Sequence, residues 1–143
     1  MSRGTTLIEL LLTLAIAGIL AALAVSGASG LRDRLRVEEA AAAIAGAHTR
    51  ARLLAVTERR VMVLTLAAGS LVLRAVESRA DTVERWRAPG ATATGVGVTG
   101  MPRTAGFAPS GVAFGFANGT YTLVRGSARK QVIVSRYGRV RVQ

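Results

Sequence analysis

Residues 4–25 read GTTLIELLLTLAIAGILAALAV, and from Leu7 to Val25 the only charged side chain is Glu9. As an α-helix, this apolar run would span roughly 28 Å, close to the thickness of the hydrocarbon core of a bilayer. Arg3 precedes the run, and the next cation after it is Arg32. The segment is therefore predicted to be a membrane-spanning helix.

A secretory signal peptide is an alternative for this segment. It would have a charged start, a shorter apolar stretch and then a small-residue cleavage site, which the residues from Ala21 to Ser26 imitate. However, the run is long for a signal peptide, and Glu9 lies within its first turns. A carboxylate inside a membrane span costs roughly 2.5–3.5 kcal/mol. Glu9 therefore needs a compensating partner and is a candidate functional residue.

Residues 4–10, GTTLIEL, resemble the type IV prepilin signal. In that signal a membrane peptidase cuts after the glycine, and glutamate is the fifth residue of the mature chain. The resemblance implies that residues 1–4 are a leader, that cleavage after Gly4 exposes Thr5, and that the new amine is methylated. It also implies that Glu9 pairs with the N-terminal amine of a neighbouring subunit, which supplies the missing partner. An ordinary membrane anchor is the alternative.

The segment departs from the family in two places. Thr5 stands where the family usually has phenylalanine, and Ser26 stands where major pilins usually carry proline. Such peptidases tolerate the first difference. The second suggests either a helix that breaks at Gly27 and Gly30 or one that stays straight.

We expect residues 5–29 to form the transmembrane and filament-core helix, and residues 30–143 to form a globular head. Within the head, residues 31–59 are predicted to be an amphipathic helix. Its expected apolar stripe consists of Leu31, Leu35, Ile44, Ala47, Ala51 and Leu54. His48 is expected at the surface or at the boundary of the core.

Residues 60–143 change to an alternating pattern that predicts β-strands. The expected strands are 61–66, 71–76, a short one around Trp86, 96–98, 112–116, 121–125, 130–135 and 138–142. Residues 89–102 are expected to be a loop apart from 96–98, and turns are expected at 68–70, 126–127 and 137–138. Asn118-Gly119 predicts a hairpin between the strands that flank it. The fold class is therefore α+β: a long N-terminal helix packed on an antiparallel sheet head, the pilin-like architecture.

The C-terminal part carries a second resemblance. Residues 107–111 (FAPSG), 118–120 (NGT), 132–135 (VIVS) and 138–142 (GRVRV) are similar to the C-terminal half of the FimT/GspH family of minor pilins and minor pseudopilins. The resemblance implies an inner-membrane protein with its head in the periplasm. Its partners would be the prepilin peptidase and other pilin or pseudopilin subunits of a pilus or pseudopilus.

The charge of the chain is strongly asymmetric. Nineteen basic and eight acidic residues give a net charge of +11, and no acidic residue follows Glu84. The later cations are Arg85, Arg87, Arg103, Arg125, Arg129, Lys130, Arg136, Arg139 and Arg141. Such a field attracts nucleic acid, anionic lipid or an acidic protein surface. The alternative is that the charge only keeps the head soluble.

A basic edge is predicted at the C-terminus. In a strand, Arg139 and Arg141 project from one face about 6.6–6.8 Å apart, with Val140 and Val142 facing the core. Strand pairing is expected to bring four further cations close to them: Arg125, Arg129, Lys130 and Arg136. Guanidinium groups bind phosphate through paired N–H donors, and few aromatic residues are present, so contacts to the DNA backbone without sequence readout are expected.

The family resemblance implies a DNA ligand as well. In FimT-like minor pilins, which contribute to DNA uptake in natural transformation, a Gly-Arg-x-Arg element near the C-terminus contacts DNA, and Gly138, Arg139 and Arg141 match it. Two alternatives stay open. The arginines could only solvate an outer sheet face and resist edge pairing, or the chain could be a GspH-like minor pseudopilin of a type II secretion system.

Composition disfavours an enzyme. The chain has no cysteine and one histidine, His48, which excludes thiolate catalysis and leaves no histidine base beside a nucleophile. We expect no metal and no cofactor.

Replacing Gly4 by a bulky residue such as leucine should block cleavage of the leader, because the peptidase cuts directly after this glycine in the signal that residues 4–10 resemble. Mass spectrometry of the purified protein should find the wild-type chain starting at Thr5 and the variant chain at Met1. A variant that is still shortened by its leader contradicts the assignment of the signal.

Glu9→Ala should leave membrane insertion intact but reduce incorporation into filaments several-fold, because the carboxylate is predicted to pair with the amine of a neighbour. The ratio of protein in sheared filaments to protein in membranes measures this effect. Glu9→Asp, which keeps the charge, is the matched control. Normal incorporation of the alanine variant would count against the pairing.

Overall fold

The computed structural model describes residues 6–78, 81–101, 103–115 and 118–143. Gly4 and Thr5, the predicted cleavage positions, lie outside the described residues. The chain divides into two compact units, residues 1–32 and 33–143, and each is described by itself. The second unit, residues 33–143, is called the head below.

Helix α1 (Leu7–Thr57) contributes its first part to the N-terminal unit. The large apolar side chains there, from Leu7 to Leu23, are exposed. This part of the helix is long and apolar enough to cross a membrane. This part is consistent with the single membrane anchor predicted from the sequence. The helix assignment continues through Gly27 and Gly30, so the alternative of a break there is wrong.

The part of α1 in the head buries a stripe of mostly small side chains. The stripe consists of Val37, Ala40, Ala41, Ile44, Ala47, His48, Ala51 and Ala55. Leu31 and Leu35, predicted to belong to it, are instead 59% and 61% exposed. The reason is the helical repeat of about 100° per residue. The nine residues from Leu35 to Ile44 correspond to two and a half turns, so the side chains of Leu35 and Ile44 point in opposite directions.

Arg59, two residues after the end of helix α1, adopts the left-handed conformation with a φ of 51°. The amide of Arg60 donates a hydrogen bond to the carbonyl oxygen of Ala55 at 3.3 Å, as in a Schellman-type helix end. The chain then turns directly into the first strand, close to the predicted boundary at residue 59.

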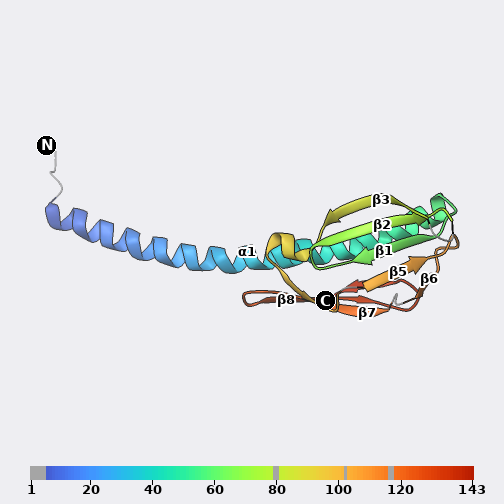
Figure 1. Cartoon of the computed structure of the whole chain (residues 1–143). Helices are drawn as coiled ribbons and strands as arrows, with labels where there is room; N and C mark the ends of the chain where they lie inside the picture. The colour runs from blue at the N-terminus through green and yellow to red at the C-terminus, as the bar shows by residue number, and fades with distance from the viewer. Residues whose placement is uncertain (1–5, 79–80, 102, 116–117) are drawn as a thin grey trace. The chain divides into compact units, whose positions relative to one another are not determined.

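The head contains two antiparallel sheets (Figure 1). The five-stranded sheet has the order β3-β2-β1-β5-β6, and the four-stranded sheet has the order β4-β7-β8-β9. The strands are β1 (Met62–Leu66), β2 (Ser70–Val76), β3 (Thr82–Pro89), β4 (Gly97–Thr99), β5 (Arg103–Phe107), β6 (Ala113–Gly115), β7 (Gly119–Arg125), β8 (Ala128–Val134) and β9 (Val140–Val142). A short 3-10 helix, η1 (Ala91–Thr94), precedes β4.

The hairpins β1–β2 and β7–β8 form as predicted, with connections at 67–69 and 126–127. The prediction missed β5, which pairs with β1 in the five-stranded sheet. Its sequence RTAGF has only Thr104 and Phe107 as strand-forming residues, and it includes Gly106. A side chain at Gly106 would collide with the ring of Phe114, so the packing favours glycine at this position. Glycine is unfavourable in a strand by propensity, which is why the sequence pattern did not indicate one.

The hairpin predicted at Asn118-Gly119 is wrong. Strand β6 pairs with β5, whereas β7 pairs with β8 and β4, so the chain crosses from one sheet to the other between them. Arg103 holds this crossing by donating a hydrogen bond from Nη1 to the carbonyl oxygen of Asn118 at 2.6 Å. Phe116, expected at the end of a strand, lies outside the described residues.

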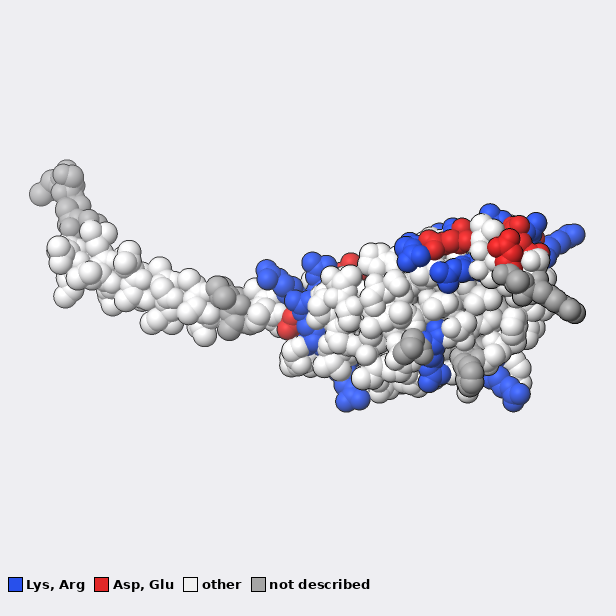
Figure 2. Space-filling view, viewed as in Figure 1, with Lys and Arg blue, Asp and Glu red and all other residues white. Residues whose placement is uncertain are grey.

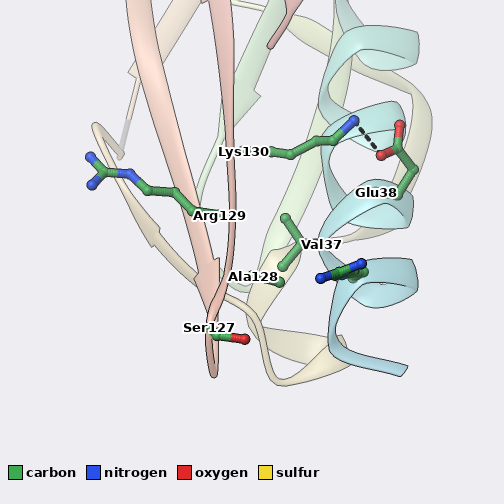
Figure 3. A pocket seen from close by; sticks show the side chains of 7 residues that line it. Val37, Glu38, Ser127, Ala128, Arg129 and Lys130 are labelled. Atoms are coloured by element: carbon green, nitrogen blue, oxygen red, sulfur yellow. Dashed lines mark ion pairs between the residues drawn. The ribbon is translucent and has the colours of Figure 1, made fainter. Parts of the chain in front are cut away.

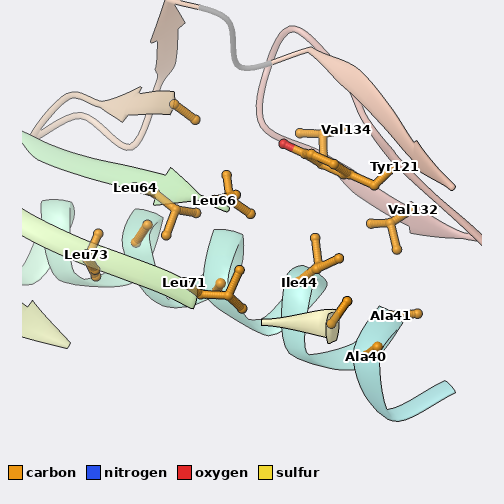
Figure 4. Close-up of a cluster of buried hydrophobic side chains, with 14 of the residues drawn as sticks. Ala40, Ala41, Ile44, Leu64, Leu66, Leu71, Leu73, Tyr121, Val132 and Val134 are labelled. Atoms are coloured by element: carbon orange, nitrogen blue, oxygen red, sulfur yellow. The ribbon is translucent and has the colours of Figure 1, made fainter. Parts of the chain in front are cut away.

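Both sheets and α1 share one hydrophobic core. Ile44 of α1 lies between Leu66 and Leu71 from β1 and β2 on one side and Val132 from β8 on the other (Figure 4). Every described member of the core lies between Val37 and Val140. We therefore expect the head to fold without the N-terminal unit.

His48 lies inside this core and is only 1% exposed, so the expectation of a surface or boundary position is wrong. Its ring lies 6.1 Å from that of Phe107 on β5 and 6.0 Å from that of Tyr121 on β7, one from each sheet. Neither ring nitrogen has a hydrogen-bond partner among the described residues. Burial lowers the pKa of His48 from 6.5 to about 4.

The head should lose stability as the pH falls from about 6.5 to about 4, because unfolding lets His48 take up a proton that the folded state excludes. The full effect of a shift of this size is roughly 3 kcal/mol in the free energy of unfolding. Urea titrations of residues 30–143 at a series of pH values measure it. His48→Leu should flatten the profile in this window, and a variant with an unchanged profile would contradict the role of the histidine.

Candidate nucleic-acid interface

The turn between β8 and β9 holds the predicted basic edge in place. The amide of Gly138 donates to the carbonyl oxygen of Ser135 at 2.9 Å, and the amide of Arg139 donates to Oγ of the same serine at 3.0 Å. Gly138 has a φ of 75° and lies against Ala113 and Phe107, so a side chain there would be both strained and crowded. The glycine of the Gly-Arg-x-Arg element thus has a structural function.

The register of β9 sets the direction of its arginines. Arg141 pairs with Ile133, and Val140 pairs with Val134, which is buried. Paired residues share a face, so Arg139 and Arg141 project from the outer face, as predicted. Val140 packs against the core. Val142, predicted to do so too, is 37% exposed, because β9 is an edge strand with no strand beyond it.

Arg129 on β8 projects from the same outer face. It pairs with Val124 of β7, and the other residues of this face are mostly uncharged and polar. They include Thr120, Thr122, Gln131, Ile133 and Gln143. None of the described residues of this face has an acidic side chain, and Arg129, Arg136, Arg139 and Arg141 have no ion-pair partner in the described part of the chain.

The structure does not bring Arg125 and Lys130 to this face. Both side chains point toward α1, where Arg125 pairs with Asp33 at 2.8 Å and Lys130 pairs with Glu38. Arg125 also donates a hydrogen bond to the carbonyl oxygen of Thr94. Strand alternation separates them from Arg129, so the expected cluster of six cations does not form: Arg125 and Lys130 face the helix, whereas Arg129, Arg139 and Arg141 face outward.

The carboxylates of the head beyond residue 57 lie near the five-stranded sheet. Glu58 pairs with Arg85 at 3.2 Å, and Glu84 pairs with Arg87 at 2.6 Å. The hydrogen bond from Arg87 lowers the pKa of Glu84. Figure 2 shows acidic and basic side chains adjacent along the side of the head that carries β3. Positive charge is therefore compensated there and uncompensated on the outer face of the four-stranded sheet.

Tyr137 is a candidate that the sequence analysis did not single out. It lies in the turn between Arg136 and Gly138 and is 78% exposed. An exposed aromatic ring beside cations can stack on nucleobases. In the sequence, only the position of Tyr137 in the predicted turn, next to the predicted arginines, could have indicated it. No group of three His, Cys, Asp or Glu side chains that could hold a metal ion occurs among the described residues.

A long N-terminal helix whose first part is apolar and exposed, and whose second part packs on antiparallel sheets, is the architecture of type IV pilin-like proteins. Comparison of sequences agrees. The chain is 32% identical to the pilin-like protein PilA1 of Thermus thermophilus over an alignment of 157 residues, which covers 99% of this chain and 98% of the relative. The chain therefore belongs to the type IV pilin-like proteins.

Solved structures show the same fold. The type IV minor pilin FimU of Pseudomonas aeruginosa (strain PAO1) matches with a TM-score of 0.62 at 16% identity, covering 77% of this chain and 90% of that one. A second crystal form of FimU matches with a TM-score of 0.58 at 15% identity, covering 74% and 91%. No family model matches the chain.

Proposed function

We propose that this chain is a minor pilin of a type IV pilus that contacts DNA through the outer face of its four-stranded sheet. In this proposal the leader ends at Gly4, and the apolar part of α1 anchors the subunit in the inner membrane with the head in the periplasm. Glu9 meets the methylated amine of Thr5 from a neighbouring subunit during assembly. Relationship to a pilin-like protein over the whole chain supports this arrangement.

The observation that carries the DNA proposal is the lack of counter-charge around Arg129, Arg139 and Arg141. These three side chains share one face, without an acidic side chain or an ion-pair partner among the described residues. Arg139 and Arg141 are two residues apart in an extended segment, a separation of about 6.6–6.8 Å along the chain, so both are placed to contact phosphates of one nucleic-acid backbone. Such contacts to the backbone carry no sequence information.

This geometry divides the residues predicted from the sequence into two groups, those proposed to contact DNA and those proposed to be structural. Arg129, Arg136, Arg139 and Arg141 are proposed to contact phosphates, and Gly138 shapes the turn that positions two of them. Arg125 and Lys130 are proposed to be structural, because their charges are already used by Asp33 and Glu38. The pseudopilin alternative shares the anchor and the fold but has no need of a face that binds phosphates.

A fragment of residues 30–143, which contains the whole head, should bind duplex DNA of unrelated sequences with similar affinity. Arg139→Gln/Arg141→Gln should weaken binding about tenfold at moderate salt and lower the slope of log K against log salt by roughly 1.8, since two phosphate contacts are lost. Fluorescence anisotropy with labelled duplexes at several salt concentrations measures both quantities.

The matched control is Arg52→Gln/Arg59→Gln, which removes the same charge from exposed arginines outside the proposed face. If the control variant weakens binding as much as the double variant of β9, the effect is one of net charge and the assigned face is wrong. If the folded wild-type head does not bind DNA at low salt, the DNA proposal fails and the pseudopilin alternative gains support.

A further inference from the structure

A cleft of about 390 Å³ lies between α1 and the β7–β8 hairpin, within the head (Figure 3). Its lining combines the beginning of the head part of α1 with the tip of the hairpin. The lining residues are Arg34, Val37, Glu38, Ser127, Ala128, Arg129 and Lys130. The outer face that we propose for DNA shares only Arg129 with this set, and Arg129 directs its guanidinium group away from α1.

Two ion pairs fix the hairpin to the helix and thereby define the cleft. Arg125 pairs with Asp33 just before the turn, and Lys130 pairs with Glu38 beyond it. Gly126, with a φ of 55°, makes the turn, and any side chain there would collide with the carboxylate of Asp33. The walls are therefore positioned by contacts that do not involve Arg34.

The cleft has the donors that a phosphate group requires. Arg34 is exposed and has no carboxylate partner in the described part of the chain. Ser127 directs its hydroxyl group toward α1 (Figure 3). Glu38, the acidic member of the lining, is already paired with Lys130, so the cleft keeps a net positive charge. A guanidinium fork with a neighbouring hydroxyl matches the geometry of phosphate oxygens.

The position of the cleft in the chain favours a lipid phosphate. Arg34 follows the end of the apolar run at Val25 by nine residues, about two and a half helical turns. Leu35 beside it is exposed, and so is Leu31 before it. Leu31 and Leu35 are four residues apart and so share one face of the helix, with arginines at positions 32, 34 and 36 around them, as in helices that lie in the headgroup region of a membrane.

The charge bias across the predicted span supports the same source. Arg32, Arg34 and Arg36 follow the span, on the side opposite Arg3. An excess of cations on the non-cytoplasmic side runs against the usual bias, and anionic headgroups on that side would compensate it. Arg36 is paired with Glu39 at 2.9 Å, which leaves Arg32 and Arg34 of these three without a carboxylate partner among the described residues.

We propose that the cleft between α1 and the β7–β8 hairpin binds the phosphodiester headgroup of an anionic phospholipid through Arg34 and Ser127 while the subunit is held in the membrane. This inference rests on the membrane anchor and is independent of DNA binding. The headgroup would orient the head on the membrane surface before assembly, and extraction into a filament would release it.

The test uses the full-length chain, purified in detergent and mixed with phosphatidylglycerol or phosphatidylcholine of identical acyl chains. Native mass spectrometry counts the lipids retained per protein. Wild type should retain phosphatidylglycerol about fivefold better than phosphatidylcholine, and Arg34→Gln should abolish most of that preference. Arg52→Gln, at an exposed helix position outside the cleft, is the control and should keep it.

Four outcomes would overturn the proposal. The first is equal retention of the two lipids by wild type, and the second is an unchanged preference in Arg34→Gln with an unchanged circular dichroism spectrum. The third is displacement of phosphatidylglycerol by millimolar inorganic phosphate, which would assign the cleft to a free anion. The fourth is an Arg34-dependent dimer in the same spectra, which would assign it to an acidic group of a second copy. Loss of DNA binding in Arg139→Gln/Arg141→Gln is independent of all four outcomes.

Discussion

The close contact of one face of α1 with both sheets is the constraint on which the head depends. That face carries Ala40, Ala41, Ala47, Ala51 and Ala55, whose small side chains let strands from the two sheets approach the helix on either side of Ile44. His48 stands on the same face, between an aromatic ring from each sheet. Because protein interiors tolerate few voids, a larger residue at these alanines would push a sheet away from the helix. The positions of the hairpin β7–β8 and the strand β9 follow from this contact.

Local patterns predicted the parts of this fold that depend on local chemistry. The apolar run before Ser26, the helical head segment and most strands were visible in the sequence, because burial on one face imposes a period of about 3.6 or 2. The partition into two sheets was not visible. Strand β5 pairs with β1 across some forty residues of chain, and Asn118-Gly119 has the composition of a hairpin turn although its flanking strands belong to different sheets. Such pairings are decided by packing on α1, which no local window contains.

The same division applies to the candidate site. Alternation along a strand was enough to place Arg139 and Arg141 on one face. It could not reveal that Arg125 and Lys130 are engaged in ion pairs. Their partners are Asp33 and Glu38, and the residues of each pair are 92 positions apart in the chain. Tyr137 was overlooked because a lone tyrosine in a turn has no periodic neighbour to draw attention to it. Net charge alone therefore overstated the basic surface, and the ion pairs of the structure reduce it to the arginines without counter-charge.

The few carboxylates of the chain explain how one small head can carry two separate sets of arginines without counter-charge among the described residues. Each carboxylate on the head part of α1 forms an ion pair with a nearby cation: Asp33 and Glu38 pair with residues of the β7–β8 hairpin, and Glu39 pairs with Arg36. The outer face of β8 and β9 is turned away from these groups by strand alternation, so its arginines keep their full charge. Arg34 keeps its charge for a different reason, since Glu38, four residues on, is occupied by Lys130. Replacing Lys130 by an uncharged residue would free Glu38 to pair with Arg34 at an i,i+4 spacing, which would neutralise the cleft while leaving the outer face unchanged.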